Sequence, residues 1–487
     1  MKVFEPASLF TPTDLTIAEA LSAFRDGIMT STELVQACLD RAEEGKELNV
    51  YVTLDGAGAL EAAKLVDQQH KKGEPLKPLS GIPIVVKDNI HAAGMQCTSG
   101  SPAFAGFIPS EDAPTVQKLR EAGAIILGKT NMHELAFGAT GYNHSYNTGS
   151  GPGVRNPYDS SRIAGGSSSG SAAALGARMA LGALGTDTGG SMRIPPALNG
   201  CAALRPSADR YSSQGVIPIA RSRDTVGPMA LCMADVALLD SIMTGEYASP
   251  SIALSELRFG LPSEFWLNLD ADTQAQAEAA LAALRKHGVT FVPIEDSGLQ
   301  SLNEPVGFPV VIHEAYDCMV DYLREYGHDM TIDQLASKIA SPDVRWIYDN
   351  WVLPRKMPSG DSIADENLVD VQPVYEAAQN GGRQALRERY QEIFEAHQLD
   401  ALFFPTTAIV APLANDDIYL PANFERLIQN TEPSASAGIP SIQLPVGLGA
   451  QSGLPVGVEL DGPAGSDRRL LAIGQTLESV FGRVTRA

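Results

Sequence analysis

Apolar residues follow a helical spacing in several segments of this chain. Residues 30–33 read TSTE, which has the form of a capping box, and the apolar positions from Leu34 to Ala42 that follow lie on one helical face. The same spacing predicts helices over 115–122 and 272–287, ended by Gly123 and Gly288, and a closing helix over 470–481. The chain is therefore expected to contain several amphipathic helices.

Short continuous apolar runs predict strands. The clearest run is 82–86, which has the character of a strand buried on both faces of a sheet. Similar runs occur at 124–127, 289–294 and 402–404, and further strands are expected in 438–460. Because helices and strands alternate, we expect one large α/β domain over 1–487, an α/β/α arrangement with a mostly parallel or mixed central sheet covered by helices.

Two regions differ from this alternation. Residues 1–70 read as a helical N-terminal segment. Residues 298–397 read as a mainly helical insert within the domain, and this insert holds Trp346 and Trp351, two of the three tryptophans. No internal repeat is visible.

Composition and charge narrow the class of protein. With 487 residues, 44% hydrophobic and 19% charged, the chain resembles an ordinary globular protein. A formal net charge of −22 disfavours nucleic acid as a partner, since phosphates are bound by Lys and Arg. No apolar run reaches the roughly 18 residues of a membrane span, and no signal peptide is apparent. Five widely spaced cysteines predict neither disulfides nor a zinc site. We expect a cytoplasmic protein.

The segment 162–193 carries the candidate chemistry. It reads RIAGGSSSGSAAALGARMALGALGTDTGGSMR and contains two glycine-framed serine loops, 165–171 and 187–191. An apolar stretch of helix-then-strand length joins the loops. Glycine lets backbone N–H groups approach a ligand closely, so a serine in such a loop can be built together with an oxyanion hole. Flexible Gly/Ser turns are the alternative, but linkers do not normally alternate with apolar segments.

These loops resemble the signature of the amidase signature family, serine hydrolases whose catalytic triad is Ser, a second Ser and Lys. The GGSS loop, the GTD-x-GGS-x-R loop and the 24-residue spacing between Ser167 and Ser191 all match. The family lysine, which ends an apolar strand, matches Lys87 in GIPIVVKDN. The resemblance runs from about residue 10 to the C-terminus and is weakest between about 290 and 395. It implies an amidase that needs no cofactor and no metal.

Amide hydrolysis requires an activated nucleophile, a stabilised oxyanion and protonation of the leaving amine. We assign Ser191, which ends its loop at an expected helix start, as the nucleophile, and Lys87 as the base. A lysine in water has a pKa of about 10.4, which burial at a strand end should lower. Ser167 would relay the proton, and the family likeness implies that it follows a cis peptide bond. The remaining assignments are the oxyanion donors Thr188, Gly189, Gly190 and Ser191, and the supporting residues Asp187 and Arg193.

Three other motif matches carry less weight. Residues 123–130 read GAIILGKT and fit the Walker A pattern, but the residues between the glycines are themselves the predicted strand. Residues 166–170 fit a nucleophile elbow with Ser168 as nucleophile, but no strand is predicted directly before them. His133-Glu134 begins like a zincin motif but lacks the second histidine.

The substrate is the most open question. Residues 339–344 and the C-terminal blocks within 430–469 resemble the indoleacetamide and mandelamide hydrolases of the family. We expect a small primary amide that bears an aryl ring, bound against a wall that includes Gly138, Ala139 and Thr140 together with aromatic residues from the insert. A plain surface turn is the alternative for that wall.

Several functional alternatives stay open. The chain could be the glutamine-hydrolysing A subunit of a tRNA-dependent amidotransferase, or a hydrolase of related esters, anilides or carbamates. A scaffold without activity is a further possibility, which the intact Lys87, Ser167 and Ser191 set disfavours. We expect a small-molecule amide as the partner, with no nucleic acid and no membrane, and a homodimer is left open.

Overall fold

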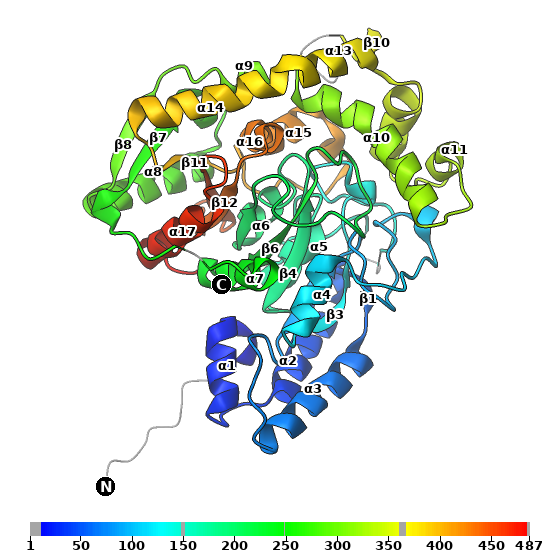
Figure 1. Cartoon of the computed structure of the whole chain (residues 1–487), viewed down its shortest axis with the longest axis vertical. Helices are drawn as coiled ribbons and strands as arrows, with labels where there is room; N and C mark the ends of the chain where they lie inside the picture. Colours follow the sequence, from blue (N-terminus) through cyan, green and yellow to red (C-terminus); the bar gives the residue numbers. More distant parts are fainter. Residues whose placement is uncertain (1–10, 148–150, 248, 360–366, 485–487) are drawn as a thin grey trace.

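An eleven-stranded mixed sheet runs through the molecule and is surrounded by helices (Figure 1). The structure, a computed structural model, describes residues 11–147, 151–247, 249–359 and 367–484. The expected mixed sheet is confirmed, since β2 runs parallel to β3 and β4 while β4 and β6 are antiparallel. In spatial order its strands are β1 (Tyr51–Leu54), β3 (Ile125–Thr130), β2 (Pro83–Lys87), β4 (Gly182–Asp187), β6 (Thr225–Ala230), β5 (Ala202–Arg205), β12 (Ser441–Leu448), β13 (Pro455–Asp461), β11 (Ala401–Pro405), β7 (Arg258–Pro262) and β8 (Thr290–Ile294).

The helices occur between the strands and in a long run between β8 and β11. They are α1 (Ile17–Arg25), α2 (Ser31–Glu44), α3 (Gly56–Lys71), α4 (Pro114–Glu121), α5 (Ser169–Gly176), α6 (Ile194–Asn199), α7 (Met233–Thr244), α8 (Ala271–Lys286), α9 (Leu299–Asn303), α10 (Gly307–Glu325), α11 (Ile332–Ala336), α12 (Pro342–Ile347), α13 (Val371–Ala377), α14 (Arg383–His397), α15 (Pro421–Ile428), α16 (Glu432–Ala437) and α17 (Asp467–Phe481). In the described ranges, no helix combines the length and apolar character needed to cross a membrane.

Short helical turns complete the architecture. They are η1 (Pro12–Asp14), η2 (Lys46–Leu48), η3 (Pro102–Phe104), η4 (Glu134–Ala136), η5 (Leu254–Glu256), η6 (Ser263–Trp266), η7 (Tyr348–Val352), η8 (Ala378–Gly382) and η9 (Asp416–Tyr419). The segment predicted as helical at the N-terminus holds α1, α2 and α3, together with the edge strand β1. The insert is mainly helical but also contains a small antiparallel pair, β9 (Lys356–Pro358) and β10 (Leu368–Asp370), that the pattern did not predict.

The helix beginning predicted from TSTE is confirmed. Thr30 Oγ1 accepts a hydrogen bond from the Glu33 N–H at 3.1 Å, and the Thr30 N–H donates to Glu33 Oε2 at 2.7 Å. This reciprocal capping box satisfies two N–H groups that the first helical turn would otherwise leave unpaired. Its effect is to fix the beginning of α2.

Two expectations about local structure were wrong. Strand β3 extends to Thr130, three residues beyond the predicted end, because Gly128 allows the Thr53 carbonyl of β1 to approach closely. Lys129 is therefore buried in the strand, near Asp88, and does not belong to a phosphate-binding loop. Helix α6 begins at Ile194 and not at Ser191, because Asp187 holds the backbone N–H groups of Gly190 and Met192 in a turn before it.

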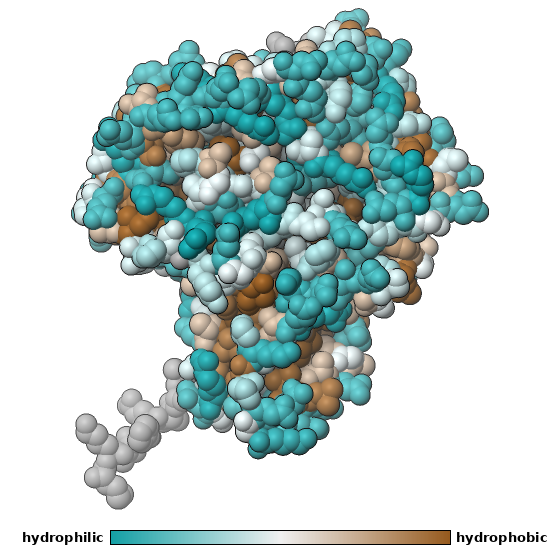
Figure 2. Space-filling model, viewed as in Figure 1, coloured by the Kyte–Doolittle hydropathy of each residue, from teal (hydrophilic) through white to brown (hydrophobic). Residues whose placement is uncertain are grey.

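The face shown in Figure 2 is mostly hydrophilic. Apolar residues gather in the lower part of this view, where the N-terminal segment lies. The central strands are buried, and Ile84, Val85 and Val86 of β2 have no solvent exposure. Burial of such a side chain is worth about 1.5–3 kcal/mol, so β2 is a rigid support for the residue that ends it.

Candidate active site

The site forms where the parallel strands β2 and β4 end next to each other. Val86 of β2 pairs with Leu184 of β4, so the carboxyl ends of both strands lie at the same edge. Lys87 is the last residue of β2, and β4 leads directly into the loop 188–191. The serines 167 and 168 immediately precede α5, whose chain continues into β4. This topology brings together three segments that are separated by up to about a hundred residues in the sequence.

Lys87 is fully buried and hydrogen bonded to two hydroxyl groups. Its Nζ donates to Ser167 Oγ at 2.8 Å and to Thr186 Oγ1 at 2.7 Å. Burial lowers the pKa of Lys87 to about 7, although the charges of Asp187 and Asp224 act in the opposite direction. A substantial fraction of the amine is therefore neutral near neutral pH and has a lone pair for a proton. Thr186 was not assigned a role from the sequence, although it is part of the GTD motif.

The two neighbouring serines have different environments. The peptide bond between Gly166 and Ser167 is cis, as the family resemblance implied, and Ser167 Oγ faces Lys87. Ser168 is fully buried, and its Oγ donates to the Thr186 carbonyl at 3.0 Å. It does not line the cavity described below. These contacts make Ser168 a structural link between the loop and β4, and they argue against the nucleophile-elbow alternative.

Three positions of the loop 188–191 are each held by a different partner. Thr188 Oγ1 donates to Asp224 Oδ1 at 2.5 Å, and the Gly189 carbonyl accepts from Thr431 Oγ1 at 2.6 Å. The Gly190 N–H donates to Asp187 Oδ1 at 2.8 Å. Within the described residues, the N–H groups of Thr188, Gly189 and Ser191 have no such partner. Of the four predicted oxyanion donors, three are thus free and that of Gly190 is occupied.

Asp187 and Arg193 belong to a buried ionic cluster beneath the loop. Arg193 contacts Asp187 at 3.1 Å and Glu459 at 2.5 Å, and Arg205 contacts Asp187 at 2.6 Å. Burial alone would raise the pKa of Asp187, but the two guanidinium groups hold it well below its usual range. Glu459 has the opposite shift, because burial raises its pKa well above the usual value. The cluster connects the loop to β5 and β13.

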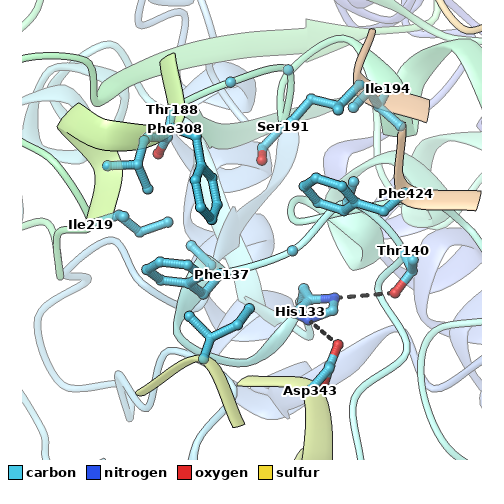
Figure 3. Close-up of a pocket in the computed structure, with 18 of the residues that line it drawn as sticks. His133, Phe137, Thr140, Thr188, Ser191, Ile194, Ile219, Phe308, Asp343 and Phe424 are labelled. Atoms are coloured by element: carbon cyan, nitrogen blue, oxygen red, sulfur yellow. Dashed lines mark hydrogen bonds and ion pairs between the residues drawn. The ribbon is translucent and has the colours of Figure 1, made fainter. Parts of the chain in front are cut away.

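Ser191 lies at the wall of a cavity of about 560 Å³ (Figure 3). Its Oγ makes no hydrogen bond to the residues that the structure describes. The predicted wall residues Gly138, Ala139 and Thr140 all line the cavity. Most of the remaining wall is apolar or aromatic, and its rings are Phe137, Phe308, Trp346, Trp351, Tyr419 and Phe424.

The aromatic residues of the wall come from several parts of the chain, and only some of these were predicted to reach the pocket. Phe308, Trp346 and Trp351 belong to the insert, where aromatic residues were expected to reach the pocket. Tyr419 and Phe424 come from η9 and α15, for which no role was predicted. His133 and Asp343 also line the cavity, and no local pattern connects them, since they are about two hundred residues apart.

Comparisons with known proteins show the family to which the chain is related. A model of the Amidase family matches residues 33–471. The chain is 41% identical to mandelamide hydrolase from Pseudomonas putida over 96% of this chain and 92% of that protein. It is 37% identical to an indoleacetamide hydrolase from Agrobacterium vitis over 96% of this chain and 97% of that protein. The solved structure of native peptide amidase from Stenotrophomonas maltophilia is similar with a TM-score of 0.78 at 28% identity, covering 97% of this chain and 98% of that one. The chain therefore belongs to the amidase signature family and is an amide-cleaving hydrolase.

Proposed function

We propose that this enzyme hydrolyses small primary amides that carry an aryl ring, releasing a carboxylic acid and ammonia through an acyl-enzyme on Ser191. One observation carries the proposal. A buried lysine with a pKa near 7 is hydrogen bonded to Ser167, and Ser191 lies at the wall of an aromatic cavity at the same edge of the sheet. This arrangement supplies a base, a relay, a nucleophile and a place for an apolar ring.

The nucleophile is activated by a proton relay. Ser191 Oγ turns towards Ser167 Oγ as substrate binds and gives its proton to it, while Ser167 gives its own proton to the neutral Nζ of Lys87. Catalytic hydrogen bonds are often absent or long before substrate binds and form in the complex. The 2.8 Å hydrogen bond from Lys87 Nζ to Ser167 Oγ supports the second half of this relay.

The oxyanion is stabilised by the backbone of the loop. As Ser191 attacks the amide carbonyl, the free N–H groups of Thr188, Gly189 and Ser191 donate to the developing negative charge. Each such donor is typically worth about 3 kcal/mol in the transition state. The anchors on Asp224, Thr431 and Asp187 keep the loop in place, so little reorganisation is needed during the reaction.

The proton then returns to the substrate. Lys87 reprotonates Ser167, which delivers a proton to the leaving nitrogen, and the carbon–nitrogen bond breaks to release ammonia. Water attacks the resulting ester by the same route, which regenerates Ser191 and releases the acid. Thr186 positions the lysine through the 2.7 Å hydrogen bond from Nζ.

The aromatic wall supports an aryl substrate. Phe137, Phe308 and Phe424 face the cavity near Ser191 (Figure 3). Two relatives are named for amides that carry an aryl group on the carbon next to the carbonyl, mandelamide and indoleacetamide. Burial of the ring is worth about 2–3 kcal/mol, so the specificity constant for phenylacetamide should exceed that for acetamide by tens- to a hundredfold.

Ammonia release from the purified chain tests the proposal. Phenylacetamide should be hydrolysed without partner subunits, and Ser191→Ala should lose this activity while keeping its fold. Equal specificity constants for acetamide and phenylacetamide would show that no ring is bound. A requirement for glutamine and partner subunits would favour the amidotransferase alternative. Matched phenylacetate esters, anilides and carbamates in the same assay would show whether they are also cleaved.

We also propose that the protein is cytoplasmic. All five cysteines are buried and unpaired, which is consistent with the reducing cytoplasm expected from the sequence. The homodimer remains a prediction, to be measured by light scattering.

A further inference from the structure

Besides the Ser191 loop, two ionic pairs face the cavity, and they differ in how well they are satisfied. Arg223 donates to the carbonyl groups of Thr188 and Gly307 and lies 3.3 Å from Glu432. The other carboxylate oxygen of Glu432 accepts from Asn303 at 3.1 Å. This first pair is fully engaged within the protein and supports the loop. In the second pair, His133 with Asp343, some polar atoms have no hydrogen-bond partner among the described residues.

His133 is held in a defined orientation and tautomer. Its ring lies against Gly138, where any side chain would collide with it. The Gly141 N–H donates to His133 Nδ1 at 3.2 Å, and Thr140 Oγ1 lies 3.3 Å from the same atom. Because Nδ1 accepts, the hydrogen-bond network assigns the ring proton to Nε2. Nε2 lies 3.1 Å from Asp343 Oδ2, yet it has no hydrogen-bond partner among the described residues.

Asp343 has an acceptor without a donor. Its Oδ2 faces His133, while its Oδ1 is shielded from solvent and accepts no hydrogen bond from the described residues. An acceptor that is removed from water and left unpaired is costly, and more so when it is charged. With Oδ1 shielded, the accessible oxygen of Asp343 is Oδ2, which also accepts no hydrogen bond from the described residues; because Asp343 lines the cavity, a ligand there can donate one to Oδ2.

The position of the pair relates it to the substrate. Figure 3 shows Ser191 and Asp343 on opposite sides of the cavity, with the rings of Phe137 and Phe424 in the region between them. A substrate whose amide meets Ser191 and whose ring lies among these side chains therefore extends towards Asp343.

We infer that Asp343, positioned by His133, is a specificity-determining residue that accepts a hydrogen bond from a donor on the aryl ring of the substrate. The inference rests on the proposed function. The donor is a hydroxyl, a ring N–H or an ammonium group, all of which offer hydrogen to a carboxylate. A ring that carries a carboxylate is repelled, and a ring without a donor leaves Oδ2 without this hydrogen bond.

Ring-substituted phenylacetamides of similar size test this inference. The specificity constant for 3- or 4-hydroxyphenylacetamide should exceed that for the corresponding fluorophenylacetamide by about tenfold, the lower end expected for a hydrogen bond to a charged group, because Asp343 is partly exposed. An aminomethyl substituent in the same positions distinguishes a cationic donor from a neutral one. In Asp343→Asn the ratio between donor and fluoro substrates should fall towards one.

Asp349→Asn is a matched control, because Asp349 lies in the same insert but pairs with Arg345 and does not line the cavity. It should keep the wild-type ratio. Equal constants for all ring substituents in the wild type, or an unchanged ratio in Asp343→Asn, would overturn the inference. If the wild type hydrolysed no arylacetamide at all, the proposed function would fail instead. If the aminomethyl substrate were preferred over the hydroxyl, the inference would hold with a cationic donor.

Discussion

At the scale of single residues, the proposed chemistry depends on the environment of Lys87. Its described hydrogen-bond partners are hydroxyl and carbonyl oxygens, and none is a carboxylate. An ammonium ion there loses hydration without gaining an ion pair, so the neutral amine is favoured. The nearby Lys129 is also buried, but it faces Asp88 at 3.5 Å. The same residue type is thus the proposed base at one position and an ion-pair partner at another.

The pH dependence of catalysis should report the pKa of Lys87. Since the neutral amine is the proposed base, kcat/KM for phenylacetamide should be constant above the Lys87 pKa of about 7 and fall tenfold per pH unit below it. Asp224, whose burial raises its pKa to about 6, is a second group at the loop that titrates in this range. The decrease of kcat/KM at low pH should therefore persist in Asp224→Asn. If this decrease disappeared in that variant, it would be due to Asp224, and the proposed role of Lys87 would be contradicted.

At the scale of elements, the loop 188–191 combines two glycines with different requirements. Gly190 has φ of +140°, and a Cβ there would collide with the side chain of Thr431. A Cβ on Gly189 would meet only ordinary contacts, the nearest being 3.5 Å away. Gly190→Ala should therefore lower kcat at least a hundredfold, by displacing the donors of the oxyanion hole, whereas Gly189→Ala should cost much less. Steady-state kinetics of both variants checks this, and equal losses would show that the backbone of the loop is not strained by substitution.

The local sequence pattern was sufficient to predict some elements and insufficient for others. The strand that ends at Lys87, the capping box at Thr30 and the two serine loops depend on neighbouring residues, and the structure confirms them. The beginning of α6 and the length of β3 depend on Asp187 and on the close approach of β1, so local pattern placed them incorrectly. The cavity is built from η4, the insert and α15, which are far apart in the sequence. Sequence alone could therefore identify the candidate catalytic residues but not the partner of His133.

At the scale of the whole molecule, burial of Lys87 should lower the free energy of unfolding. The pKa of this amine is about 7 in the folded chain and about 10.4 in the unfolded one, so between these values the unfolded state binds more protons. Stability should therefore rise with pH from about 7 to about 10, by up to roughly 4 kcal/mol. At pH 7, Lys87→Met should be more stable than the wild type by about 2 kcal/mol, after the loss of the lysine's hydrogen bonds, and should lack this rise.

Urea denaturation at pH 7 and pH 9 measures this effect. Lys129→Met is the matched control, because it leaves the buried Asp88 without its cation and should destabilise the fold by about 3–5 kcal/mol. A Lys87→Met variant that is less stable than the wild type at pH 7 would mean that the lysine is charged and favourably paired in the folded protein.

The site of covalent modification by an arylalkyl fluorophosphonate tests the central claim most directly, since such a reagent reacts with an activated serine. Intact mass and peptide sequencing should find one adduct per chain, on Ser191. The adduct should form equally in Ser168→Ala, far more slowly in Lys87→Ala, and not at all in Ser191→Ala. A label on Ser168, or labelling of Ser191→Ala at the wild-type rate, would contradict the assignment of Ser191 as the nucleophile.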